Sequence, residues 1–194
     1  VVAGDGPIKT LADLKAKAAQ GQGVTFASAG NGTSGHLAGE LLKARLGGQM
    51  LHVPYKEGGM AMNDVMTSRA DFMFYHPAAV LPHMQAGKLR ALGASGAQRS
   101  AAARDVPAIA EQTSSDFDLV AWFMLYAPAA TPAPVVARLR QATAAALAKA
   151  ETAGKLAAQG VEQRPLGPDA MDAFARTEVA KWAALVRQSG AQVD

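Results

Sequence analysis

The sequence contains no cysteine among its 194 residues, which excludes disulfide bonds, thiolate metal sites and a cysteine nucleophile. No apolar run approaches the roughly 20 residues that a membrane-spanning helix needs. The four histidines lack the spacing of a zinc site, so we expect no bound metal. Aromatic residues make up only 6% of the chain, and its lysines and arginines are scattered rather than clustered. We therefore expect no nucleic-acid partner.

Candidate strands and helices alternate along the first half of the chain. The expected strands cover residues 24–28, 50–54, 71–75 and 89–93. The expected helices cover residues 11–19, 34–46, 59–69 and 78–86. This alternation favours an α/β fold with a mostly parallel sheet flanked by helices. Right-handed crossovers would place the carboxyl ends of the strands along one edge, marked by Ser28, Tyr55, Tyr75 and Ser95.

The second half of the chain is expected to add a carboxyl-terminal helical return segment. The apolar run 119–127 predicts a long buried strand that crosses between two lobes. A short edge strand is expected at 161–164, and a final helix from about residue 168 to Gly190. One face of that helix carries Phe174, Trp182 and Leu185, and we expect it to face a part of the fold that lies outside these 194 residues.

The most informative segment is 24–34, a strand that runs into a glycine-rich turn and then into a helix with Thr33 or Ser34 as its N-cap. Such a turn presents backbone N–H groups and the positive end of a helix dipole to an anion. The candidate ligand-binding residues in and after it are Ser28, Ala29, Asn31, Gly32, Thr33, Ser34 and His36. Tyr75 and His76, at the end of another strand on the same edge, complete the candidate set.

Two alternatives to simple ligand binding stay open. Residues 30–35 satisfy the G-x-G-x-x-G dinucleotide pattern, so a nucleotide-linked α/β enzyme is one alternative. A dinucleotide site would also need an Asp or Glu roughly 20 residues later, where this chain has Tyr55 and Lys56. A self-associating structural module is the other. Hydrolase chemistry is disfavoured, since Gly35 directly follows Ser34 and the nucleophile elbow is missing.

Several segments, taken in order, resemble the solute-binding receptors of tripartite tricarboxylate transporters, the Bug-type periplasmic proteins. The likeness begins with 28–40, which reads Ser-Ala-Gly-Asn-Gly-Thr-Ser-Gly-His-Leu-Ala-Gly-Glu. It continues through residues 52–56 with Gly58 and Gly59, then 71–74, 82–92, 105–107 and 127–134. The resemblance covers nearly the whole chain in the right order and spacing.

The resemblance implies a periplasmic, non-enzymatic receptor without a cofactor, in which two α/β lobes close like a Venus flytrap on a small carboxylate. The membrane subunits of the transporter would then be its partners. Residues 1–122 would form the second lobe, and 123–194 the crossing strand and the carboxyl-terminal segment of the first lobe. The rest of the first lobe would precede position 1, so we expect the chain alone to self-associate. Tyr75 and His76 replace a frequent Asp-Asn of the family, so its ligand preference does not transfer.

Overall fold

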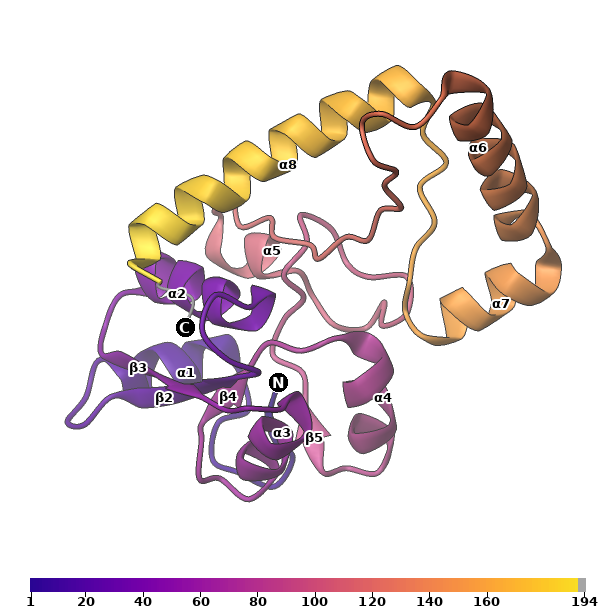
Figure 1. Ribbon diagram of the computed structural model, residues 1–194. Coiled ribbons are helices and arrows are strands. Elements are labelled where there is room, and N and C mark those ends of the chain that lie inside the picture. The colour runs from indigo at the N-terminus through magenta and orange to yellow at the C-terminus, as the bar shows by residue number, and fades with distance from the viewer. Residues whose placement is uncertain (192–194) are drawn as a thin grey trace.

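A three-stranded parallel sheet forms the centre of the molecule. In the computed structural model, which describes residues 1–191, β2 (Val24–Ser28) lies between β3 (Met50–Pro54) and β4 (Phe72–Met73) (Figure 1). The first two of these strands have the predicted bounds, and β4 is shorter than predicted. The expected α/β architecture, a mostly parallel sheet flanked by helices, is confirmed.

A short antiparallel pair of strands lies beside β4. β1 (Val2–Ala3) pairs with β5 (Leu89–Arg90). Val1 also exchanges two backbone hydrogen bonds with Met73, at 2.8 and 3.0 Å. The prediction of a fourth parallel strand is therefore wrong, and Ser95 does not end a strand of the parallel sheet. Hydrophobic patterning identifies a strand but not its direction, which is set by the neighbour that it pairs with.

Helices cover both faces of the sheet because successive side chains of a strand point to opposite faces. Side chains on one face share a core with α1 (Leu11–Ala18) and α2 (Ser34–Leu46). Side chains on the other face share a second core with α3 (Gly58–Met66) and α4 (Pro77–Gln85). Phe26 belongs to the first core, and the next residue of β2 to the second. The body therefore has three layers.

The helix α2 lies close to β2 because a glycine faces the sheet. A Cβ atom added at Gly39 would overlap the ring of Phe26, which is fully buried. The backbone of α2 therefore rests directly on the aromatic ring. This contact fixes where α2 starts relative to the end of β2, and Thr33 caps the helix as predicted by accepting a hydrogen bond from the His36 N–H.

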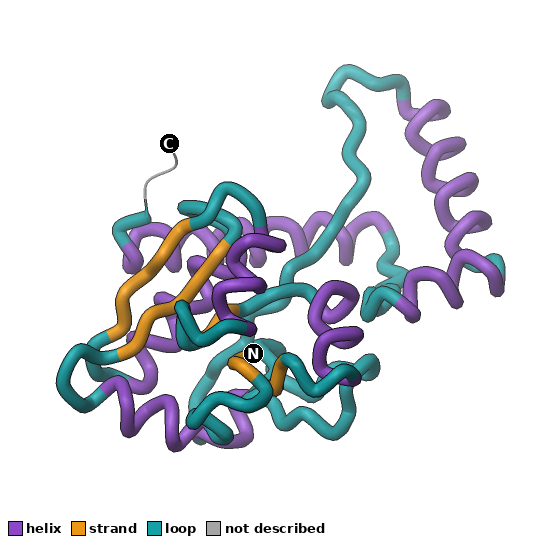
Figure 2. Tube along the Cα trace, turned by 90° about the horizontal axis from the view of Figure 1, so that it is seen from below, coloured by secondary structure: helices purple, strands orange, loops and turns teal. Residues whose placement is uncertain are grey.

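Within residues 91–191 the structure contains helices and no strand. The helices are α5 (Ile109–Thr113), α6 (Ala133–Leu147), α7 (Ala150–Ala158) and α8 (Pro168–Ser189). Figure 2 shows the long loop that leaves the body before α6. The predicted strands at 119–127 and 161–164 are wrong, since neither segment pairs with another strand. Among the described residues, no helix is long and apolar enough to span a membrane.

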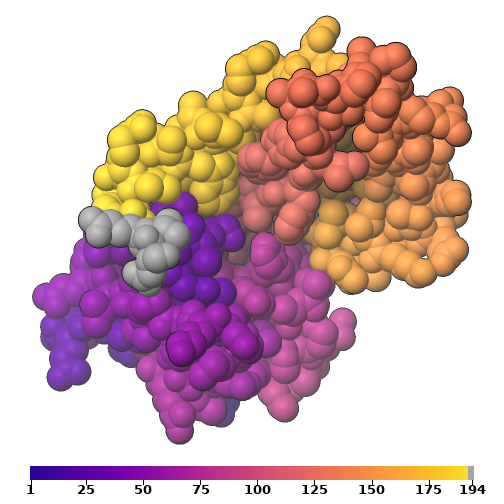
Figure 3. Space-filling model, in the orientation of Figure 1, coloured from indigo at the N-terminus to yellow at the C-terminus, as the bar shows by residue number. Residues whose placement is uncertain are grey.

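The helix α8 returns to the body and lies across α2 (Figures 1 and 3). Trp182 and Leu185 pack, partly buried, against the core that holds α1 and α2. The indole of Trp182 donates to Glu178 at 3.1 Å, and Phe174 meets Trp122 edge to face. Contrary to the sequence prediction, the helix face is therefore not left entirely to a part of the fold outside the chain. Its contacts with α2 and with the loop before α6 cover it only in part, since Trp182 and Leu185 stay half-buried and Val186 is 37% exposed.

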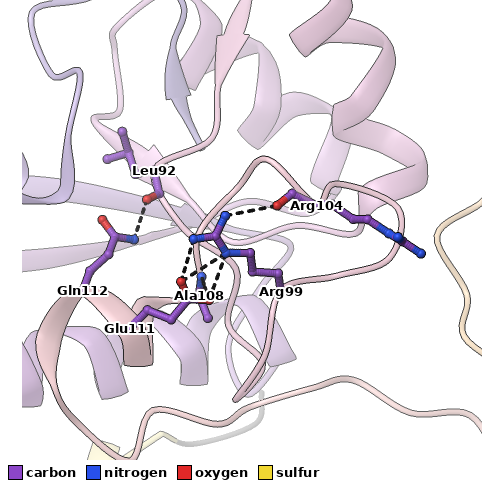
Figure 4. A network of polar contacts seen from close by, with 6 residues as sticks. All are labelled: Leu92, Arg99, Arg104, Ala108, Glu111 and Gln112. Carbon is purple, nitrogen blue, oxygen red and sulfur yellow. Dashed lines mark hydrogen bonds and ion pairs between the residues drawn. The ribbon is translucent and has the colours of Figure 1, made fainter.

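A polar network holds the loop after β5 against α5 (Figure 4). Arg99 donates to the carboxylate of Glu111 at 3.1, 3.1 and 2.7 Å, and to the carbonyl oxygen of Arg104 at 3.3 Å. The Gln112 amide donates to the carbonyl oxygen of Leu92 at 2.9 Å. The hydrogen bonds from Arg99 lower the pKa of the Glu111 carboxyl. Because this ion pair is exposed, it contributes little stability and mainly restricts the loop.

Replacing Gly39 tests the close contact between α2 and β2. We expect Gly39→Ala to lower the free energy of unfolding by roughly 1–3 kcal/mol, because the new methyl group has no room beside the buried Phe26 ring. Gly59→Ala is the matched control, since no heavy atom lies within 4 Å of a Cβ atom added there. Urea unfolding measures both. Equal unfolding midpoints for the two variants would contradict the proposed contact.

Candidate functional site

Three strand ends and three helix starts meet at one edge of the parallel sheet. β2 leads into α2 at Ser34, β3 into α3 at Gly58, and β4 into α4 at Pro77. The carboxyl ends of parallel strands share an edge, so the amino ends of the three helices gather there. None of the three carries an acidic residue in its first turn. The exposed Glu57, however, is the N-cap residue of α3. The amino ends of α2 and α4 therefore present positive dipole ends without an acidic residue at the N-cap or in the first turn.

The turn between β2 and α2 has a backbone shape that requires glycine at two positions. The φ angles are +120° at Gly30 and +72° at Gly32, a region that residues with a Cβ atom rarely adopt. The Thr33 hydroxyl donates to the carbonyl oxygen of Gly30 at 2.8 Å and accepts the His36 N–H at 3.4 Å. This hydroxyl therefore closes the turn and caps α2 at the same time.

Ser28 supports the same turn from the inside. Its side chain is fully buried. The hydroxyl donates to the carbonyl oxygen of Gly30 at 3.0 Å, accepts the Gly30 N–H at 3.2 Å and lies 2.6 Å from Nε2 of His52. With three partners and no exposed surface, the Ser28 side chain acts on the shape of the turn.

His36 lies at the start of α2 and contacts the glycine-rich turn. It is buried, and its Nδ1 atom accepts the Gly32 N–H at 3.0 Å. Its ring stacks on His52 with centroids 3.7 Å apart, and His52 stacks on Phe26 with centroids 5.0 Å apart. Burial lowers the pKa of both histidines, and that of His52 falls to about 4, with the nearby His36 as a second cause. Both rings are therefore neutral at pH 7.

The N–H groups of Ser34 and Gly35 are candidate donors for a ligand. They are the first two of α2, and no carbonyl within the helix can accept them. Both residues are half-buried, as are Ala29 and Asn31. The Gly32 N–H, in contrast, is already bonded to His36. A small anion on this turn would therefore meet the start of the helix first.

Tyr75 and His76 flank the turn from the segment after β4. A Cβ atom added at Gly35 would come within 2.8 Å of the carbonyl oxygen of Phe74, so this segment runs beside the start of α2. The Tyr75 phenol packs against Gly58, and His76 is the exposed N-cap of α4. The structure thus brings the predicted residues of both segments to one edge. Their contacts with a ligand stay a prediction.

Other polar side chains near this edge are engaged within the protein. The Tyr55 hydroxyl donates to Asp64 at 2.7 Å. Burial raises the pKa of the Tyr55 phenol, and the hydrogen bond to Asp64 adds to the effect. Within residues 1–191, no group of three or more His, Asp or Glu side chains could hold a metal ion. At the turn itself the edge offers hydrogen-bond donation from backbone N–H groups, and the exposed Lys56 and Glu57 lie in the connection between β3 and α3.

The sequence analysis missed the support that His52 gives to the turn. In the parallel register His52 lies opposite Phe26. Residues 26 and 28 point to the same face of the sheet because they are two apart, so His52 shares that face with Ser28. This alternation is present in the sequence, but it becomes informative only once the pairing of β2 with β3 is known.

The sequence as a whole matches one protein family. The family model described as "Tripartite tricarboxylate transporter family receptor" matches residues 1–191. The chain belongs to this family. The resemblance inferred from the sequence is confirmed.

Curated relatives of this receptor chain share about a third of its residues. The UPF0065 protein in the tcbD-tcbE intergenic region of Pseudomonas sp. (strain P51) is 32% identical over 96% of this chain and 56% of its own length. Protein BugT of Bordetella pertussis is 32% identical over 94% of this chain and 55% of its own length. The chain thus spans about half the length of these curated relatives.

Solved structures have the same fold as this receptor chain. The R. palustris Rpa4515 structure with adipate has a TM-score of 0.86 at 27% identity, covering 98% of this chain and 64% of that one. The periplasmic binding protein BugD has a TM-score of 0.80 at 29% identity, with the same coverage. MatC from Rhodopseudomonas palustris with bound malate has a TM-score of 0.79 at 25% identity, covering 95% and 64%.

The stacked histidines predict loss of stability in acid. Histidine in an unfolded chain titrates near pH 6.5, whereas folded His52 takes up a proton only near pH 4. The unfolded state therefore binds more protons between these values, and the free energy of unfolding falls as the pH is lowered through this window. His52→Gln, which removes the titrating ring, should flatten this dependence. Urea unfolding at several pH values tests it, and an unchanged pH dependence in the variant would contradict it.

Proposed function

We propose that this chain forms part of a periplasmic receptor that captures a small carboxylate for a tripartite tricarboxylate transporter. The observation that carries the proposal is the convergence of three helix amino ends on the glycine-rich turn, of which α2 and α4 have no acidic residue at the N-cap or in the first turn. Helix amino ends bind carboxylates through free N–H groups and the dipole. Structural neighbours were solved with adipate and malate, which supports this ligand class.

The two parts of the chain have different places in the proposed receptor. Residues 1–122 would be the second lobe, because nearly all buried residues fall within it. Residues 123–194 would belong to the first lobe. Neither α6 nor α7 contains a buried residue, and α8 would be the element of this segment that packs against α2 of the second lobe. Closure of two such lobes around a ligand is a common receptor motion. The turn would then form one side of the site.

The proposed role is binding without catalysis. The donors at the edge are backbone N–H groups, which hold a carboxylate but transfer no proton to it. Tyr75 and His76 would face the variable end of the ligand, because they lie beside the turn and His76 is exposed. The loaded receptor would then meet the membrane subunits of the transporter in the periplasm.

Replacing Thr33 tests whether the turn is the binding site. We expect Thr33→Ala to weaken binding of a suitable acid by about tenfold, because it removes the helix cap and the hydroxyl bond that closes the turn. Thr33→Ser keeps both hydrogen bonds and should bind nearly as the wild type does. Calorimetry with adipate, malate and related acids, on the full-length protein, measures this. Unchanged affinity in Thr33→Ala would place the site elsewhere.

The same calorimetry separates the carboxylate proposal from the nucleotide alternative. Residues 30–35 keep the dinucleotide pattern, but β3 is followed by Tyr55 and Lys56 and offers no carboxylate for a ribose. We therefore expect binding of acids and no binding of NAD or ATP. Nucleotide binding that Thr33→Ala abolishes would favour the enzyme alternative.

We also propose that the 194-residue chain by itself self-associates. The loop before α6 exposes Phe123, Leu125 and Tyr126 by 81%, 72% and 64%. An exposed apolar patch of this kind commonly marks an interaction surface. Light scattering should show dimers or larger species at micromolar concentration, and the double variant Phe123→Ser, Leu125→Ser should shift them toward monomer. A wild-type chain that stays monomeric would disprove this proposal.

A further inference from the structure

Two histidines make hydrogen bonds that support the glycine-rich turn. His36 comes from α2 and His52 from β3, and their rings lie nearly parallel, 7° apart, with centroids separated by 3.7 Å. Each ring makes a hydrogen bond into the turn, His36 to the Gly32 N–H and His52 to the Ser28 hydroxyl. Packing alone would require the rings but not these two bonds.

The bond from Gly32 defines the state of the His36 ring. Because Nδ1 accepts an N–H, it carries no proton, and the neutral ring holds its proton on Nε2. The bond fixes the direction of the Gly32 peptide at one of the two turn positions where φ is positive. Without an acceptor at this position, the half-buried Gly32 N–H would lose its partner and the turn would lose a constraint.

The second histidine acts through Ser28. The Ser28 hydroxyl gives its single proton to the carbonyl oxygen of Gly30, so His52 donates to it through Nε2. Ser28 also accepts the Gly30 N–H. The peptide groups on both sides of Gly30 are therefore held by one hydroxyl, and His52 holds that hydroxyl in place.

From these contacts we infer that His36 and His52 are positioning residues, which hold the turn in its ligand-binding shape through their hydrogen bonds. The inference rests on the proposed function, since it assigns these residues to the same site. It requires a neutral His36 ring, since Nδ1 must accept, and burial lowers the pKa of His36. The charged side chains that act on His36 are Glu40 and Lys43, which pair with each other at 3.5 Å.

Matched substitutions separate hydrogen bonding from packing. His36→Asn keeps an acceptor near the Nδ1 position and loses the ring, whereas His36→Phe keeps the stacked ring and loses the acceptor. His52→Gln and His52→Phe do the same for the Nε2 donor. We expect the Asn and Gln variants to bind adipate or malate within about threefold of the wild type, and the Phe variants about tenfold more weakly, as for one lost hydrogen bond. The reverse order of affinities would overturn the inference.

A measurement without ligand keeps this test independent of the proposed function. In ¹⁵N-labelled protein, the bond between Gly32 and His36 should give a scalar coupling between the Gly32 nitrogen and Nδ1 of His36. His36→Phe should abolish the coupling and speed hydrogen exchange at the Gly32 amide about tenfold, while His36→Asn should leave that exchange slow. A wild-type protein that binds neither acid would count against the proposed function only. Absence of the coupling, or equal exchange in both variants, would overturn the inference about the histidines.

Discussion

The contact between Gly39 and the ring of Phe26 sets the geometry on which the rest of this fold depends. β2 is the central strand of the sheet, and α2 is the helix that follows it. Because the helix backbone rests on a buried ring, the distance between strand and helix is fixed. The turn between them must then join two fixed ends over residues 29–33. Its shape follows from this constraint as much as from its own glycines.

The aromatic rings beneath the turn connect the apolar core with the polar site. Phe72 stacks on Phe26 at 5.5 Å, Phe26 on His52 at 5.0 Å, and His52 on His36 at 3.7 Å. Imidazole suits the end of such a column, because it packs like an aromatic ring and forms hydrogen bonds at its edge. A phenylalanine there would fill the space but leave the Gly32 N–H without its acceptor. A lysine would bring a charge into a buried place.

Backbone donors would have a consequence for the proposed receptor, which must also release its ligand. A helix amino end stabilises a nearby anion by about 0.3–1 kcal/mol when exposed, and by up to about 2 kcal/mol when partly buried. Several such ends acting together can hold a carboxylate, yet none forms an ion pair that must be broken at release. The convergence of α2, α3 and α4 therefore suits reversible capture better than a buried arginine would.

The sequence predicted best those elements whose ends are marked by local chemistry. β2, α2 and β3 have the predicted bounds, because Thr33 caps the helix and Gly47 ends it. The meeting of the turn with Tyr75 and His76 at one edge was also predicted, since it follows from strand order and right-handed crossovers. The roles of His36 and His52 depend on the pairing of β2 with β3 and on how closely α2 packs on the sheet. Neither the pairing nor this packing distance can be predicted from one segment of the sequence alone.

The errors in the second half of the chain have a single physical cause. An apolar run shows that burial is favourable, but it does not specify the partner that covers it. In the run 119–127, Leu119 is buried at 3% exposure and donates to Ser95, whereas Phe123, only four residues later, is 81% exposed. The strand prediction required a neighbouring strand, and the body offers none there. The pattern of α8 was correctly assigned to a helix, but its partner α2 lies more than 120 residues earlier and could be recognised only in three dimensions.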